Sequence, residues 1–353
     1  MSSVSAQFLH FSKRKFLSRL SMEDWVVENL FNGNRELQIQ AATQLSKLSS
    51  KQRHRLAEAG IIPPLISMLQ SQDFEAIEAS LLALLGLAFG SERNKIRIVK
   101  SGIIPVLLEL LQCESEELIE LSMAAMLILS SCKPNKLIIA SSGAIQVVVQ
   151  ILNDVNNGLF SIQARVDAIA TLQNLSTCHQ TIPLIASSGA IYTLLQLIHG
   201  HEKSSELTEK AISLLESIVF SSEDSVSETV RITGAIRIIV EAMEEGSPQC
   251  KEHAVGILLH ICQSCRDKYR GLILMEGVMP GLLQLSVDGT WGAKNMARDL
   301  LFLLRDCSDY ASTSKQSRHE LMEQIMQAID ADGEKVDGTT LRLVQEMITK
   351  LNI

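Results

Sequence analysis

The residues best suited to chemistry are Cys262 and Cys265, which form the single Cys-x-x-Cys pair in the sequence. Such a pair could supply two thiolate ligands for zinc, but a structural zinc site needs four ligands. No second Cys-x-x-Cys occurs, and the nearby His260 would bring the count to three. The alternatives are a metal site or small buried thiols near a helix end. The ligand count favours the thiols, so we expect neither a metal site nor a cofactor.

Other stretches that resemble ion or substrate sites fail on spacing. The segment DADGEKVDG, residues 330–338, has the acidic residues of a calcium loop. However, its glycine is not at the sixth position, and the twelfth position is Leu341 instead of glutamate. His199 and His201 flank Gly200 in an expected loop, where solvated side chains are the simpler interpretation. Phosphate-binding loops, nucleophile elbows and zinc-protease helices have recognisable motifs that do not occur here. We therefore expect no catalytic residues and no small-molecule substrate.

Composition narrows the remaining classes of function. The chain has 353 residues, a net charge of -8 and 4% aromatic residues, which argues against general nucleic-acid binding. No run of 18 apolar residues occurs, so we do not expect a membrane-spanning helix. Seven cysteines scattered through apolar segments are typical of reduced thiols. We expect a cytoplasmic or nuclear protein.

The sequence contains an internal repeat, and the helices of that repeat must position any binding site. One segment recurs six times, from AGIIPPLISML at 59–69 to EGVMPGLLQLS at 276–286. Its glycines are separated by 42, 41, 46, 45 and 43 residues, a period typical of stacked helical repeats; they are Gly60, Gly102, Gly143, Gly189, Gly234 and Gly277. Each unit predicts a short helix before the glycine, a second helix after it and a longer third helix.

The third helices are predicted from apolar spacing, as in 163–177, where Val166, Ile169, Leu172 and Leu175 recur every three residues. We assign residues 1–21 to a basic N-terminal arm, 22–49 to capping helices and 50–306 to six repeats. Residues 307–353 would form a degenerate C-terminal capping repeat. In the sixth repeat we place the third helix at 296–304.

The repeated motif resembles that of the armadillo repeat superfamily over roughly residues 22–305. Its pattern is [A/S]-G-[A/I]-I-P-x-L-[V/I/L]-x-L-L, followed by a third helix. It is most similar to the armadillo region of plant U-box proteins. This resemblance implies an all-α, right-handed solenoid of three-helix repeats that binds protein partners. In those proteins the U-box recruits a ubiquitin-conjugating enzyme. Residues 1–55 do not show the Cys-Pro and Trp pattern of a U-box, so we expect no direct ligase activity.

Candidate binding residues follow from a second resemblance, to the groove of importin-alpha. That family places Trp and, four residues later, Asn on successive third helices. None of the Trp-equivalent positions is Trp, which argues against a nuclear-import receptor. Asn174 matches at an Asn-equivalent position, where an amide can hold a partner backbone; the alternative is an amide bonded locally or by solvent. Ser217 and His260 would extend the same row, and Lys47 stands at the equivalent place, where it could instead cap a helix.

We expect a non-enzymatic scaffold that binds a protein or an extended peptide along a groove lined by Lys47, Asn174, Ser217 and His260. The alternative is a substrate-recognition component of a ubiquitin-ligase pathway. The basic residues Lys13, Arg14, Lys15 and Arg19 leave a third interpretation open, a scaffold at a membrane surface. A frayed terminus would explain them equally well.

Overall fold

The computed structural model describes residues 21–153 and 160–305, and this part of the chain forms helices joined by short turns, with no strand. The chain divides into two compact units, Met1–Ser188 and Gly189–Ile353. The basic residues of the expected N-terminal arm, the expected C-terminal capping repeat and the calcium-like segment 330–338 lie outside the described residues.

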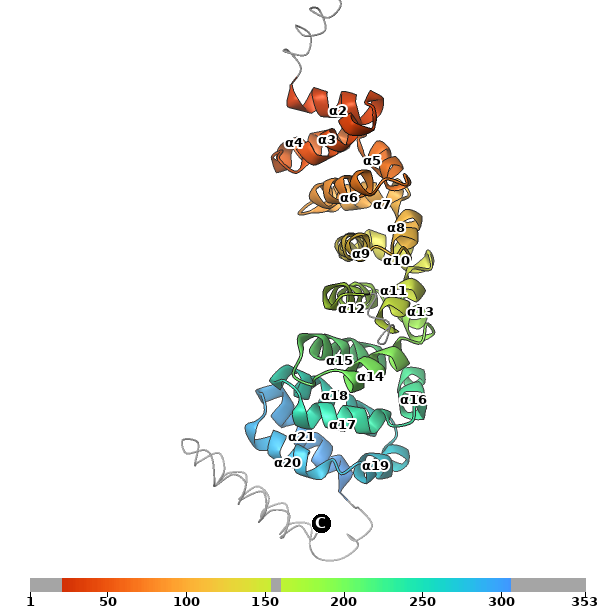
Figure 1. Ribbon diagram of the computed structural model, residues 1–353. Helices are drawn as coiled ribbons and strands as arrows, with labels where there is room; N and C mark the ends of the chain where they lie inside the picture. The colour runs from red at the N-terminus through yellow and green to blue at the C-terminus, as the bar shows by residue number, and fades with distance from the viewer. Residues whose placement is uncertain (1–20, 154–159, 306–353) are drawn as a thin grey trace, which may run out of the picture. The chain divides into compact units, whose positions relative to one another are not determined.

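The first unit begins with two helices and continues with groups of three (Figure 1). The leading pair is α2 (Met22–Asn32) and α3 (Arg35–Leu45). The complete groups are α4 (Ser50–Glu58), α5 (Ile62–Leu69) and α6 (Phe74–Ala88); α7 (Glu92–Lys100), α8 (Ile103–Leu110) and α9 (Glu116–Ser130); and α10 (Lys133–Ser141), α11 (Ala144–Asn153) and α12 (Ile162–Ser176). Helix α13 (Ile182–Ala186) opens a fourth group.

The second unit completes the fourth group and adds two more, so that the described residues contain six groups of three helices. Its helices are α14 (Ala190–Gly200) and α15 (Glu206–Val219); α16 (Glu223–Arg231), α17 (Ala235–Glu245) and α18 (Pro248–Ser264); and α19 (Arg266–Met275), α20 (Met279–Asp288) and α21 (Trp291–Leu304).

The predicted start of the last third helix was wrong. The prediction placed this helix at 296–304, whereas α21 begins five residues earlier, at Trp291. Thr290 starts this helix, because its side chain accepts a hydrogen bond from the backbone N–H of Ala293.

The repeat glycines mark the turns between first and second helices. All six adopt the left-handed backbone conformation, with φ of +86° at Gly143, a conformation that side chains with a Cβ rarely adopt. The residue five places after each glycine is fully buried; these residues are Leu65, Leu107, Val148, Leu194, Ile239 and Leu282. The glycine thus fixes both the turn and the register of the second helix against the core.

Third helices pack against one another within each unit. In the first unit α3 contacts α6, α6 contacts α9 and α9 contacts α12 (Figure 1). In the second unit α15 contacts α18 and α18 contacts α21. The apolar face predicted for α12 is largely buried. Its residues Ile169, Leu172 and Leu175 are fully buried, and Val166 is half-buried. No single repeat could bury these faces alone, so neighbouring repeats share one core.

A polar link joins the start of one third helix to the preceding one. Ser247, the N-cap of α18, accepts from the backbone N–H of Cys250 at 3.1 Å. Its hydroxyl also donates to Glu209 on α15 at 2.6 Å. At the start of α21, the hydroxyl of Thr290 likewise donates to Glu252 on the preceding third helix, α18. One hydroxyl therefore caps its own helix and bonds to the neighbouring repeat.

Within the described ranges, no single helix is long and apolar enough to cross a membrane. Two sharply bent pairs, α10 with α11 and α19 with α20, reach that length and composition only when taken together.

Candidate functional site: the third helices

The four residues expected to line a groove lie on or directly after third helices. Lys47 is exposed in the turn after α3, where its backbone N–H donates to the Gln44 carbonyl. Asn174 is half-buried on α12, in the first unit with Lys47. Ser217 and His260 belong to the second unit, on α15 and α18. The expected row from Asn174 through Ser217 to His260 stays a prediction, because it spans both units.

Asn174 is bonded to the neighbouring third helix. Its Nδ2 donates to the hydroxyl of Ser130 at 3.1 Å and to the carbonyl of Leu127 at 3.3 Å, both on α9. The carbonyls in the last turn of a helix have no partner within that helix, so this amide satisfies one of them. The amide of Asn174 is therefore bonded within the protein, to the preceding repeat, and its use for a partner backbone stays a prediction.

Ser217 and His260 lie on adjacent third helices of the second unit. Ser217 is exposed, and its hydroxyl donates to the carbonyl of Ser213 within α15. His260 is half-buried, and its ring lies against Phe220, with 4.4 Å between ring centroids. Phe220, at the end of α15, is 48% exposed. An aromatic pair with an open face can pack on an apolar or planar group of a partner.

Sequence reasoning missed the exposed apolar residues on the third helices. Phe89 follows the last residue of α6 and is 74% exposed, and Phe302 near the end of α21 is 66% exposed. With Phe220, they place an aromatic side chain at or near the end of three third helices. Leu82, within α6, is 47% exposed. The recurrence of Phe where a third helix ends was the available sequence signal, but exposure could not be read from it.

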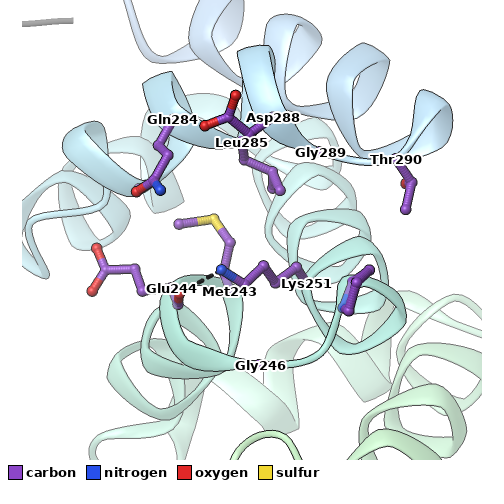
Figure 2. Close-up of a pocket in the computed structure, with 11 residues that line it drawn as sticks. Met243, Glu244, Gly246, Lys251, Gln284, Leu285, Asp288, Gly289 and Thr290 are labelled. Carbon is purple, nitrogen blue, oxygen red and sulfur yellow. Dashed lines mark hydrogen bonds between the residues drawn. The ribbon is translucent and has the colours of Figure 1, made fainter. Parts of the chain in front are cut away.

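A second feature is a pocket of about 260 Å³ in the second unit, between α17, α20 and the starts of α18 and α21 (Figure 2). Lys251 reaches across it and donates to the carbonyl of Glu244 at 2.7 Å. Burial, reinforced by the neighbouring carboxylates Glu245 and Glu241, raises the pKa of Glu244. The lining residues include neither His nor Cys, and the lining hydroxyl of Thr290 donates to Glu252.

The Cys-x-x-Cys pair is split between two environments. Cys262 is buried in α18, and burial raises the pKa of its thiol. Cys265 is exposed at the junction of α18 and α19. Burial also raises the pKa of Cys250 to about 11. A protonated, buried thiol is a poor metal ligand and nucleophile. Among the described residues no cluster of three or more His, Cys, Asp or Glu side chains could hold a metal ion.

An ion pair joins α15 to α18. Nδ1 of His253 lies 2.7 Å from Oε2 of Glu216, and both side chains are partly buried. The hydrogen bond that His253 donates to the Glu216 carboxylate raises the pKa of His253, and burial opposes that rise. The pair is favourable when the imidazole is protonated, so it links the packing of these third helices to pH.

Comparisons with known proteins agree with this architecture. A family model described as the plant U-box protein ARM repeat region matches residues 128–325. A second, the armadillo/beta-catenin-like repeat, matches residues 49–89 and 91–126. U-box domain-containing protein 45 of Arabidopsis thaliana is 30% identical over 183 residues, which cover 51% of this chain and 22% of that protein. The chain thus aligns with less than a quarter of that relative's length.

Solved structures of designed proteins show the same fold. One, described as computationally designed armadillo repeat proteins for modular peptide recognition, has a TM-score of 0.61 at 20% identity, covering 69% of this chain and 100% of its own. Another is a designed armadillo repeat protein in complex with the peptide (KR)4, with a TM-score of 0.58 at 20% identity, covering 69% of this chain and 99% of its own.

Proposed function

Because the chain belongs to the family of the plant U-box protein ARM repeat region, we propose that it is a non-catalytic scaffold that binds an extended segment of a partner protein along its third helices. The armadillo fold is an all-α repeat architecture whose extended surface suits such binding. The designed armadillo protein in complex with (KR)4 binds a peptide, which supports a protein or peptide partner for this chain.

The exposed apolar side chains on the third helices carry the proposal. Leu82 and Phe89 in the first unit, and Phe220 and Phe302 in the second, are between 47% and 74% exposed. Large side chains, aromatic ones above all, supply much of the affinity when a partner buries them. Glu109 is also exposed, but it is charged and lies on a second helix.

A photo-crosslinking experiment tests this. The photoreactive residue benzoylphenylalanine replaces Leu82 on α6 in one variant and Glu109 on α8 in the control, both in the full chain in cells. We expect Leu82 to capture a discrete partner and Glu109 not to capture it. Mass spectrometry should map the cross-link to an extended segment of the partner. Equal capture at both positions, or capture at Glu109 alone, would refute binding along the third helices.

A role in a ubiquitin pathway is the second candidate, favoured by the similarity to U-box domain-containing protein 45. In that case the scaffold would select substrates for a ligase carried by another chain. Recovery of a ubiquitin ligase or conjugating enzyme among proteins cross-linked through Leu82 would support it.

We propose a cytoplasmic or nuclear location for the protein. The six described cysteines are free, which supports such a location. Cell fractionation would test this.

A further inference from the structure

Three equivalent cations lie near the ends of third helices in the first unit. Each is the fifth residue of a first helix when the N-cap counts as the first. They are Arg53 on α4, Lys95 on α7 and Lys136 on α10. Nζ of Lys95 donates to the hydroxyl of Ser131 at 2.7 Å, where α9 ends. Lys136 donates likewise to the hydroxyl of Thr177, where α12 ends. In these two repeats the cation has an acceptor at the end of its own third helix.

Arg53 lacks the equivalent acceptor. The residue where α6 ends is Phe89, which has no hydroxyl, and Nε of Arg53 is buried without a hydrogen-bond partner among the described residues. A Cβ at Gly86 would lie 3.1 Å from Nη1 of Arg53, so the guanidinium occupies the space that a larger residue on α6 would fill. A buried donor without an acceptor is costly, since it has lost water and gained nothing.

The guanidinium borders a small pocket. The pocket has a volume of about 130 Å³ and is lined by residues of α4, the end of α6 and the start of α7, among them Ser50, Arg53, His54, Gly86, Phe89 and Asn94. Asn94 is 2% exposed; its Nδ2 donates to the carbonyl of Leu87 at 2.8 Å, while its Oδ1 has no partner in the described part of the chain. The same is true of Oδ1 of Asn135 in the next repeat. The buried, unpartnered Nε of Arg53 therefore distinguishes this repeat from the next two.

The charges around the pocket favour an anion. The cationic Arg53 lines it, and no acidic residue does. Glu58, also on α4, accepts a hydrogen bond from Nη2 of Arg97 at 3.0 Å and lies 3.6 Å from Nε2 of His54. A guanidinium donates its strongest hydrogen bonds to a carboxylate or phosphate. The volume accommodates one such group.

We propose that this pocket receives the carboxylate of an acidic residue in the partner segment, with Arg53 as its counter-charge. An apolar neighbour of the acidic residue would pack on the exposed ring of Phe89. The inference rests on the proposed binding of an extended protein segment. It adds a chemical requirement: an acidic residue beside an apolar one.

Arginine side-chain NMR tests the pocket directly. The Nε–H signals of the ¹⁵N-labelled full chain are followed during addition of acetyl-Leu-Glu-Leu-amide, its glutamine counterpart or its phosphoserine counterpart. The Arg53 signal is assigned by its loss in Arg53→Lys. We expect the glutamate peptide to shift this signal saturably and the glutamine peptide to bind roughly tenfold more weakly, because its neutral amide forms no ion pair with the guanidinium. The control Arg231→Lys, at an exposed position on α16, should leave binding unchanged.

A stability measurement separates binding from a structural role. Arg53→Met removes the buried, unpartnered donor, so its melting temperature should equal or exceed that of the unmodified chain while glutamate-peptide binding is lost. A lower melting temperature with peptide binding unchanged would make Arg53 structural and overturn the proposal. Equal binding of the glutamate and glutamine peptides would also overturn it. Tighter binding of the phosphoserine peptide would reassign the pocket to phosphate.

These readouts are independent of the cross-linking experiment. A saturable Arg53 shift without a cross-link from Leu82 would retain the anion pocket and reject binding along the third helices. A cross-link from Leu82 without the Arg53 shift would retain the scaffold and reject the pocket.

Discussion

Asn174 on α12 donates a hydrogen bond from Nδ2 to the hydroxyl of Ser130 on α9, at 3.1 Å, across the boundary between two repeats. The same Nδ2 lies 3.3 Å from the carbonyl of Leu127. The residue expected to hold a partner backbone therefore already stabilises the contact between neighbouring third helices. Any partner that used these donors would have to replace both bonds.

Asn174→Ala should lower the free energy of unfolding by about 1 kcal/mol, the usual net contribution of a partly buried hydrogen bond. Urea denaturation of the full chain, followed by circular dichroism, measures this. Ser217→Ala is the matched control, because that hydroxyl is exposed and bonds only within its own helix. If the two variants proved equally stable, the bond to Ser130 would contribute nothing, and the amide would be available to a partner.

Gly143→Ala should destabilise the first unit by about 1–2 kcal/mol, the cost of placing an L-residue in the left-handed region. Its φ is +86°, and an added Cβ would meet no atom within 4 Å, so the cost would come from the backbone alone. Gly271→Ala, within α19 and also without a close neighbour, should be neutral or stabilising by about 0.5–1 kcal/mol. Thermal melting of both variants measures the contrast, and similar melting temperatures would contradict it.

His253→Gln should destabilise the protein more at low pH than at high pH. The hydrogen bond that His253 donates to the Glu216 carboxylate raises the pKa of His253 above its ordinary value of 6.5. Its contribution to stability is therefore fully present below pH 6.5 and is lost as the pH rises through the folded-state pKa. Melting temperatures from pH 5.5 to 9 test this. The exposed His199→Gln should show no such dependence, and a His253→Gln effect that grew with pH would reverse the assignment.

Cysteine alkylation at pH 8 should label Cys265 at least roughly tenfold faster than Cys250 or Cys262, because thiolate character and access both control the rate. Cys265 is exposed, whereas the other two are buried with raised pKa values. Peptide mass spectrometry of the native chain gives the three rates, and labelling in denaturant serves as the control. Equal native rates for Cys262 and Cys265 would show that the end of α18 opens readily.

The sequence by itself determined the repeat. Each glycine acts through its own backbone, and the apolar residue five places later follows from helical geometry, so Gly143 and Val148 could be placed without knowing any neighbour. The armadillo architecture follows because one such unit cannot bury its own apolar faces.

Tertiary structure alone decided the partners of polar groups and the exposure of apolar ones. Asn174 meets Ser130, and Arg53 approaches Gly86, only after helices distant in sequence have packed together. Helical periodicity could not show that Phe89 stays exposed while Leu87 is buried two residues earlier. Exposure depends on where the next helix lies, and that position is fixed by packing between helices instead of by local conformation.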